Sequence, residues 1–205
     1  MAVGLFSGTA HAESVDYREA SVDINGNVTY TTKTADATVV TSNTTQFNVN
    51  GWYVVNSNVE ISSRITFNNY IGEVNLILCN GATLTANAGI EVGIANLLNI
   101  YAQSGGTGKL IAKGGNNAAG IGGSEGGAGG TVTIHGGSIT ATGGSQAAGI
   151  GGGGSGSAGC EVKIYGGSVT ATGGNNGAGI GGGGDQGRGY NVIHLRRHGY
   201  GYGRR

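Results

Sequence analysis

Two nearly identical stretches, TVTIHGGSITATGG at residues 131–144 and EVKIYGGSVTATGG at residues 161–174, decide the fold of this chain. Each copy is followed by a glycine-rich segment, AAGIGG from residue 147 and GAGIGG from residue 177. The second copy follows the first at a constant offset of 30 residues. Self-similarity at a fixed period is typical of a solenoid, whose units bury their hydrophobic faces only by stacking on their neighbours.

The repeat is built from short strands rather than helices. Apolar and threonine-rich segments alternate with glycine-rich turns, and alternation along each segment places every second side chain inside. Three short strands per turn predict an all-β chain folded as a right-handed parallel β-helix, because parallel crossovers have that hand. The chain has 46 glycines and no proline. The absence of proline agrees with a stack of central strands, where proline would remove a ladder hydrogen bond.

Alignment of the turns predicts four inward columns of apolar side chains. The columns are Leu76, Leu98, Val132, Val162 and Val192; Leu78, Ile100, Ile134 and Ile164; Leu84, Leu110, Ile139 and Val169, with Ala86, Ala112, Ala141 and Ala171 beside them; and Ile90, Ile121, Ile150 and Ile180. An aliphatic core of this kind is stabilised by about 25 cal/mol for each Å² of apolar surface buried.

The N-terminal part differs from the repeats. Residues 1–12 end in a small-x-small pattern after an apolar stretch, which indicates the remainder of a secretory signal peptide. Residues 13–50 contain few glycines, and strand-like segments flank Asn25-Gly26, a strong hairpin signal. We expect residues 13–50 to form an N-terminal β-hairpin cap over the open end of the core, and residues 51–193 to form the rungs.

Residues 194–205 break the pattern, since HLRRHGYGYGRR stands where the repeat should continue. One plausible codon series for this stretch, with a single base deleted, reads Ile-Ile-Tyr-Gly-Gly-Thr-Val-Thr-Ala-Thr-Gly-Gly, which is the missing unit. We therefore interpret the tail as the product of a frameshift and expect the chain to be part of a longer, multidomain protein. The same interpretation removes the basic, aromatic tail as an argument for nucleic-acid binding.

Charge and cysteines limit the function further. The formal net charge is zero, which implies neither a nucleic acid nor an anionic membrane as a partner. No stretch is long and apolar enough to predict a transmembrane segment. Cys79 and Cys160 fall three rungs apart, about 14 Å, which is beyond the reach of a disulfide.

One outward column carries the candidate binding residues, Tyr101, His135 and Tyr165. Aromatic faces suit the apolar C–H surfaces of sugar rings, so these residues form a candidate carbohydrate-binding ladder. The alternative is that the stacked side chains simply support neighbouring rungs.

Carboxylates are scattered singly through the rungs, and no column repeats an acid. They are Glu60, Glu73, Glu91, Glu125, Glu161 and Asp185. A glycosidase needs two carboxylates on either side of one bond, so no catalytic residue is predicted. The glycine-rich arcs resemble calcium-binding repeat loops but lack regularly spaced aspartates, so we predict no metal site and no cofactor, with calcium as the weaker alternative.

Several motifs together resemble a known group of proteins. WYVV (52–55), RITF (64–67), VNLILCNGATLTA (74–86), LLNIYAQSGGTGKL (97–110) and the AGIGG/TVTIHGGSITATGG units are similar to glycine-rich β-helix repeat regions of large exported, adhesin-like surface proteins of Gram-positive gut bacteria. A weaker resemblance connects the chain to clostridial calcium-dependent cellulose-binding β-helix domains, which implies carbohydrate binding without catalysis.

The sequence thus predicts a non-enzymatic, secreted or cell-surface β-helix module, adhesin-like, with a polysaccharide or host glycan as its partner. Two alternatives stay open. The chain could be a fragment of a polysaccharide lyase or hydrolase whose site lies in further rungs, or a structural stalk that displays another domain.

Overall fold

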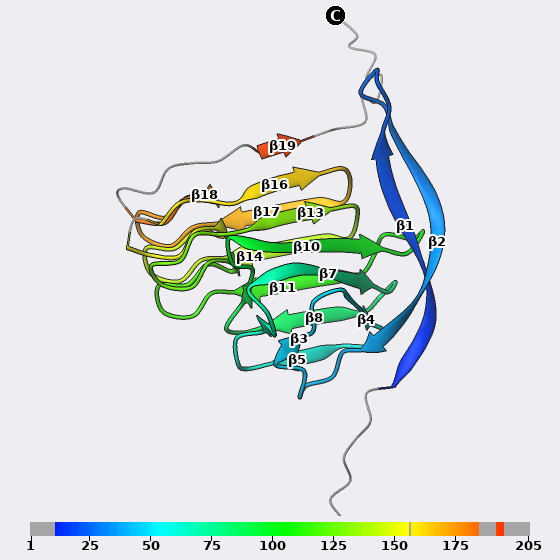
Figure 1. The fold of residues 1–205 in the computed structure, drawn as a ribbon, viewed down its shortest axis with the longest axis horizontal. Helices are drawn as coiled ribbons and strands as arrows, with labels where there is room; N and C mark the ends of the chain where they lie inside the picture. The colour runs from blue at the N-terminus through cyan, green and yellow to red at the C-terminus, as the bar shows by residue number, and fades with distance from the viewer. Residues whose placement is uncertain (1–10, 156, 185–191, 195–205) are drawn as a thin grey trace, which may run out of the picture.

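The computed structural model describes residues 11–155, 157–184 and the backbone of residues 192–194. Within these residues the chain contains β-strands and no α-helix, and therefore no helix able to cross a membrane. The strands stack in parallel rungs, and the rungs form three sheets (Figure 1). This arrangement confirms the predicted parallel β-helix.

Each turn from β7 to β18 contributes one strand to each sheet. The first sheet contains β4 (Gly51–Val55), β7 (Ile71–Leu78), β10 (Ala95–Ala102), β13 (Thr131–Ile134), β16 (Glu161–Ile164) and β19 (Val192–His194). The second contains β5 (Val59–Ile61), β8 (Thr83–Ala86), β11 (Lys109–Lys113), β14 (Ser138–Thr142) and β17 (Ser168–Thr172). The third contains β9 (Ile90–Glu91), β12 (Ile121–Gly122), β15 (Ile150–Gly151) and β18 (Ile180–Gly181).

The strand register confirms most of the predicted core columns. Leu84, Leu110, Ile139 and Val169 pair in order, as do the alanine column beside them and the isoleucine column of the third sheet. The first sheet requires a correction, because Leu98 pairs with Val74 and Ile100 pairs with Leu76. The prediction had placed Leu76 beside Leu98 and Leu78 beside Ile100. A slip of two residues keeps every side chain on the same face, so the apolar pattern alone does not fix this register.

A long hairpin precedes the rungs and is formed by β1 (Ala12–Val22) and β2 (Val28–Val39). Its turn contains Asn25-Gly26 as predicted, with Gly26 at φ 81°. β2 is one continuous strand of 12 residues. The end of β2 pairs with β4, and Arg18 of β1 pairs with Ala102 at the end of β10.

The structure corrects the placement of the predicted cap. The hairpin runs crosswise over the stacked strands, along the side of the solenoid (Figure 1). The end of the core is closed by the later part of the same predicted range, residues 13–50, which carries β3 (Gln46–Phe47) paired with β6 (Thr66–Phe67). Phe47 is fully buried, with its ring 4.4 Å from the ring of Tyr53 in the first rung.

Glycines of the third sheet allow the rungs to approach closely. Gly122, Gly151 and Gly181 form one column, each with φ between 135° and 144°. A Cβ at Gly151 would lie 1.8 Å from the carbonyl oxygen of Gly181. Only glycine fits such a position, because any side chain would overlap with the next rung.

Most residues at the two ends of the chain lie outside the described residues. Residues 1–10 of the predicted signal segment are outside the described residues, and Ala12, its last residue, begins β1. Val192 pairs with Val162 and His194 with Ile164, so the register continues to the beginning of the predicted frameshifted tail. Residues 195–205 lie outside the described residues.

Candidate functional site

The predicted aromatic residues form a single column on the outer face of the first sheet. The register places Val54, Ile77, Tyr101, His135 and Tyr165 in neighbouring rungs. The ring of His135 stacks on that of Tyr101 at 4.5 Å between centroids and lies 5.4 Å from that of Tyr165. The predicted ladder is therefore present as a stack of side chains.

The hairpin covers this ladder. Tyr17 of β1 lies 4.8 Å from the ring of Trp52 and 4.7 Å from that of Tyr101. Tyr101 and His135 are 5% and 8% exposed. The expectation of an exposed platform is therefore wrong for these two residues, since neither ring face is open to a sugar. Tyr165 is half-buried, and the Tyr30 hydroxyl of β2 donates a 3.3 Å hydrogen bond to its carbonyl oxygen.

The covered face forms a second hydrophobic core outside the solenoid. Val54 and Ile77 are fully buried although they point away from the interior, and they pack with Val15, Tyr17 and Ala37 of the hairpin. A detectable signal existed in the sequence: the runs YVV and LIL are continuously apolar, which is typical of strands buried on both faces.

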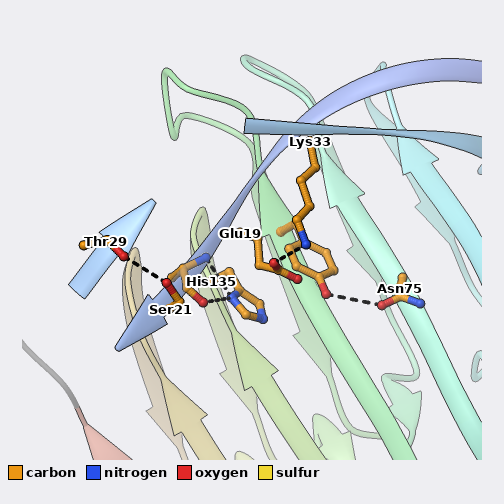
Figure 2. Close-up of polar contacts among 8 residues, drawn as sticks. Glu19, Ser21, Thr29, Lys33, Asn75 and His135 are labelled. Carbon is orange, nitrogen blue, oxygen red and sulfur yellow. Dashed lines mark hydrogen bonds and ion pairs between the residues drawn. The ribbon is translucent and has the colours of Figure 1, made fainter. Parts of the chain in front are cut away.

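His135 connects the hairpin to the middle of the sheet (Figure 2). The Ala20 amide donates to its Nδ1 at 3.1 Å, and the Ala20 carbonyl oxygen lies 3.2 Å from the same nitrogen. Burial lowers the pKa of His135, opposed by the contact with the Ala20 backbone and by Glu19. The neutral imidazole is therefore favoured, and it accepts the Ala20 hydrogen bond.

Two further polar contacts hold the covered face. Asn99 donates a 2.9 Å hydrogen bond to the Asn75 side-chain oxygen, and the Tyr101 hydroxyl donates to the same oxygen. Burial raises the pKa of Tyr101 well above its ordinary value. The Tyr101 hydroxyl therefore stays protonated at neutral pH and serves as a hydrogen-bond donor within the covered face.

The outer face of the second sheet, in contrast, is open. One outward column runs from Glu60 through Thr85, Ile111 and Thr140 to Thr170. A parallel column contains Lys113, Thr142 and Thr172, all exposed. Hydroxyl groups thus occupy both columns in the neighbouring strands β14 and β17, whereas β11 places Ile111 and Lys113 there.

A shallow groove lies at one end of the open face. Its volume is about 340 Å³, and it is lined by Asn58, Val59, Glu60, Thr83 and Thr85. The Asn87 side-chain amide donates to Oε1 of Glu60 and fixes the carboxylate beside the groove. The groove therefore offers carboxylate, amide and hydroxyl groups, which together both donate and accept hydrogen bonds.

A second, polar notch lies where the hairpin meets the corner between the first and second sheets. Its volume is about 230 Å³. The lining residues are Asp16, Tyr17, Arg18 and Thr32 of the hairpin and Asn80, Gln103 and Ser104 of the corner loops. Sequence reasoning missed this site because it depends on the position of the hairpin.

Acids and cysteines form no metal cluster in the part of the chain that the structure describes. No group of three or more His, Cys, Asp or Glu residues could hold a metal ion there. Glu125 accepts a hydrogen bond from Asn117, and Asp185 lies outside the described residues. Cys79 and Cys160 are free, and burial raises the pKa of the Cys160 thiol to about 12.

Arg64 joins three turns from inside the corner of the third sheet. Its guanidinium donates to the carbonyl oxygens of Ala88, Ala119, Gly122 and Gly123 at 2.9–3.1 Å. Nε lies 3.7 Å from the Glu91 carboxylate, and burial lowers the pKa of Arg64. The arrangement is structural, because the guanidinium is occupied by the backbone of the same chain.

Comparison with known proteins supports the repeat. A family model described as a β-helix repeat matches residues 132–154 and 162–184. No match to the chain was found among curated proteins or among solved structures. The matched segments contain β13 to β18, the two regular turns of the solenoid.

Proposed function

We propose that this chain is a non-enzymatic, adhesin-like module of a secreted or cell-surface protein and binds carbohydrate along the outer face of the second sheet. One observation carries the proposal. The hairpin closes the outer face of the first sheet, whereas the second sheet presents columns of exposed hydroxyl groups and the groove beside Glu60.

The chemistry of this face suits a sugar. Threonine hydroxyls both donate and accept hydrogen bonds, as sugar hydroxyls do. Neighbouring strands repeat at about 4.8 Å, so Thr140 and Thr170, with Thr142 and Thr172 beside them, present similar groups on adjacent rungs to an extended ligand. A stacked sheet also holds these groups before the ligand arrives, which reduces the entropy cost of binding.

Binding without hydrolysis is the simpler role for the groove. A glycosidase uses one carboxyl group as an acid and a second as a base or nucleophile. Among the residues that line the groove, Glu60 carries the one carboxylate, and Asn87 already engages its Oε1. Polysaccharide cleavage and a purely structural stalk remain the alternatives that an experiment must separate.

The test is affinity electrophoresis of the chain in gels containing neutral or acidic polysaccharides. We expect retardation by at least one polymer. The variant Thr140→Glu places a bulky charge in the middle of the face and should weaken retardation at least about tenfold. Tyr70→Ser is the matched control, because Tyr70 is 91% exposed and lies outside this face.

Each outcome decides between the roles. Retardation by none of the polymers would overturn carbohydrate binding and favour the stalk. Equal retardation of Thr140→Glu and the unsubstituted chain would place the binding elsewhere. Shortening of the polymer during incubation would contradict the non-enzymatic role and favour the lyase or hydrolase.

A further inference from the structure

The notch between the hairpin and the corner loops is built from parts that the regular repeat does not contain. Pairing of Arg18 with Ala102 brings β1 against the loop that begins at Gln103. That loop, QSGGTG, is an insertion, because the later rungs pass from His135 and Tyr165 directly to a Gly-Gly turn. The insertion and the hairpin together create a cavity that no later rung can form.

Several side chains that line the notch have hydrogen-bonding groups available to a ligand. Asp16 accepts from the Thr34 hydroxyl through Oδ1, which leaves its second oxygen available. Gln103 accepts from the Asn80 backbone amide through Oε1, and its NH₂ group has no hydrogen-bond partner among the described residues. Asn80 uses its side-chain oxygen toward Thr107 and also retains its NH₂ group. Donors therefore outnumber acceptors in the notch.

Arg18 supplies the positive charge of the notch. Its guanidinium carbon lies 4.3 Å from the centroid of the Tyr30 ring, a stacking contact that orients the planar group, and the guanidinium makes no hydrogen bond or ion pair with the residues that the structure describes. A guanidinium binds a carboxylate through two parallel hydrogen bonds. The available Asp16 carboxylate oxygen can only accept a hydrogen bond. It therefore requires a hydroxyl or another donor on the ligand.

We propose that this notch binds a hexuronic acid, as a free sugar or as a residue of an acidic polysaccharide. Arg18 pairs with the sugar carboxylate, the NH₂ groups of Asn80 and Gln103 donate to sugar oxygens, and Asp16 accepts from a sugar hydroxyl. A cavity of about 230 Å³ has roughly the volume of eight water molecules, enough for one pyranose ring. The site shares no lining residue with the groove of the second sheet, so it goes beyond the function proposed above.

The experiment is a titration of the full chain with D-galacturonate and, as a matched neutral probe, D-galactose, followed by NMR shifts of the Asn80 and Gln103 side-chain amides. We expect galacturonate to bind at least about tenfold more tightly than galactose, since only the acid pairs with Arg18. Affinity should fall as salt rises, because the ion pair is exposed to solvent.

Variants separate this site from the rest of the chain. Arg18→Gln should weaken galacturonate binding at least about tenfold and leave the weak galactose binding unchanged. Lys33→Gln is the control, because Lys33 pairs with Glu19 and does not line the notch. Hydrogen exchange of β2 amides reports whether the hairpin stays docked, and Gln103→Ala tests the loop side without touching the hairpin.

The proposal is overturned if galacturonate and galactose bind equally, if neither binds, or if Arg18→Gln binds galacturonate as before while the hairpin stays docked. Thr140→Glu, which tests the open face, should leave galacturonate binding unchanged. Loss of one activity without the other therefore distinguishes failure of this inference from failure of the proposed function.

Discussion

The ring of Tyr17 in the hairpin lies 4.7 Å from the ring of Tyr101 in the first sheet, and both side chains are about 5% exposed. This contact makes the hairpin part of the folded solenoid rather than an appendage. It also buries the aromatic column whose faces would otherwise be open. Tyr17, His135, Gly151 and Arg64 each make a contact whose removal has a measurable effect.

Tyr17→Ala should loosen the hairpin. Removal of a buried aromatic side chain costs about 3 kcal/mol of unfolding free energy, and here the cost falls on the hairpin first. Hydrogen exchange of the amides in β2 should accelerate, whereas exchange in β14 should stay slow. Tyr70→Ala is the control, since Tyr70 is exposed. Unchanged exchange in β2 would contradict the role given to Tyr17.

Acid should weaken the attachment of the hairpin at His135. Burial lowers the pKa of the folded-state imidazole below 6.5, so the detached or unfolded chain takes up a proton at higher pH than the native chain does. Stability is then full above about pH 6.5 and falls as the pH drops through the window between 6.5 and the lowered pKa. The ring is surrounded by Glu19, Lys33, Tyr101 and Tyr165. These residues are the same in the two proteins compared below.

The measurement is the urea midpoint at several pH values between about 5 and 8 for the unsubstituted chain and for His135→Gln. The variant should lose the pH dependence that His135 contributes. Parallel curves for the two proteins would show that His135 does not titrate on release of the hairpin.

Gly151→Ala should destabilise the solenoid more than an alanine at an open glycine. Gly151 has φ 144°, and a Cβ there would lie 1.8 Å from the Gly181 carbonyl oxygen. Strain and overlap together should cost more than about 2 kcal/mol of unfolding free energy. Gly81→Ala is the matched control, because Gly81 has φ 78° but no neighbour within 4 Å. Equal thermal midpoints for the two variants would refute the close approach of the rungs.

Arg64→Met should separate the turns that the guanidinium joins. The change leaves the carbonyl oxygens of Ala88, Ala119, Gly122 and Gly123 without their charged donor. We expect a loss of about 3 kcal/mol by chemical denaturation. Lys113→Met removes an exposed cation from the second sheet and should change stability by less than about 0.5 kcal/mol. A similarly small effect of Arg64→Met would show that water replaces the guanidinium at these carbonyls.

The repeat made the solenoid and most of its register predictable. In the second sheet, Leu110, Ala112 and their partners alternate with residues that are exposed or partly exposed. The sequence therefore identifies the inward face of each strand, and with it the columns of the core. In the first sheet, β7 is eight residues long, and its last five residues are buried on both faces. Its apolar run permits two registers with the same inward side, which is why Leu76 was assigned to the wrong neighbour.

The position of the hairpin was not predictable in the same way. Asn25-Gly26 indicates that β1 and β2 form a hairpin, but a turn signal carries no information on where the pair docks. The docking depends on Val15 and Tyr17 meeting Val54, Ile77 and Tyr101, contacts between segments far apart in sequence. Because the candidate ladder and the polar notch both depend on this docking, the sequence identified the aromatic column but not its burial or the site beside it.

The crosswise hairpin also has a mechanical consequence. In a stack of rungs, a pull along the solenoid axis is resisted rung by rung, by the hydrogen bonds between one strand and the next. The hairpin lies parallel to that pull and contacts β4 through Val39, β10 through Arg18, and the segment after β16 through Tyr30. A pulling force between distant rungs is therefore also carried by β1 and β2. It acts along these strands and shears the hydrogen bonds between them. The hairpin therefore links the rungs along the solenoid axis from β4 to the segment after β16, the regular repeats included.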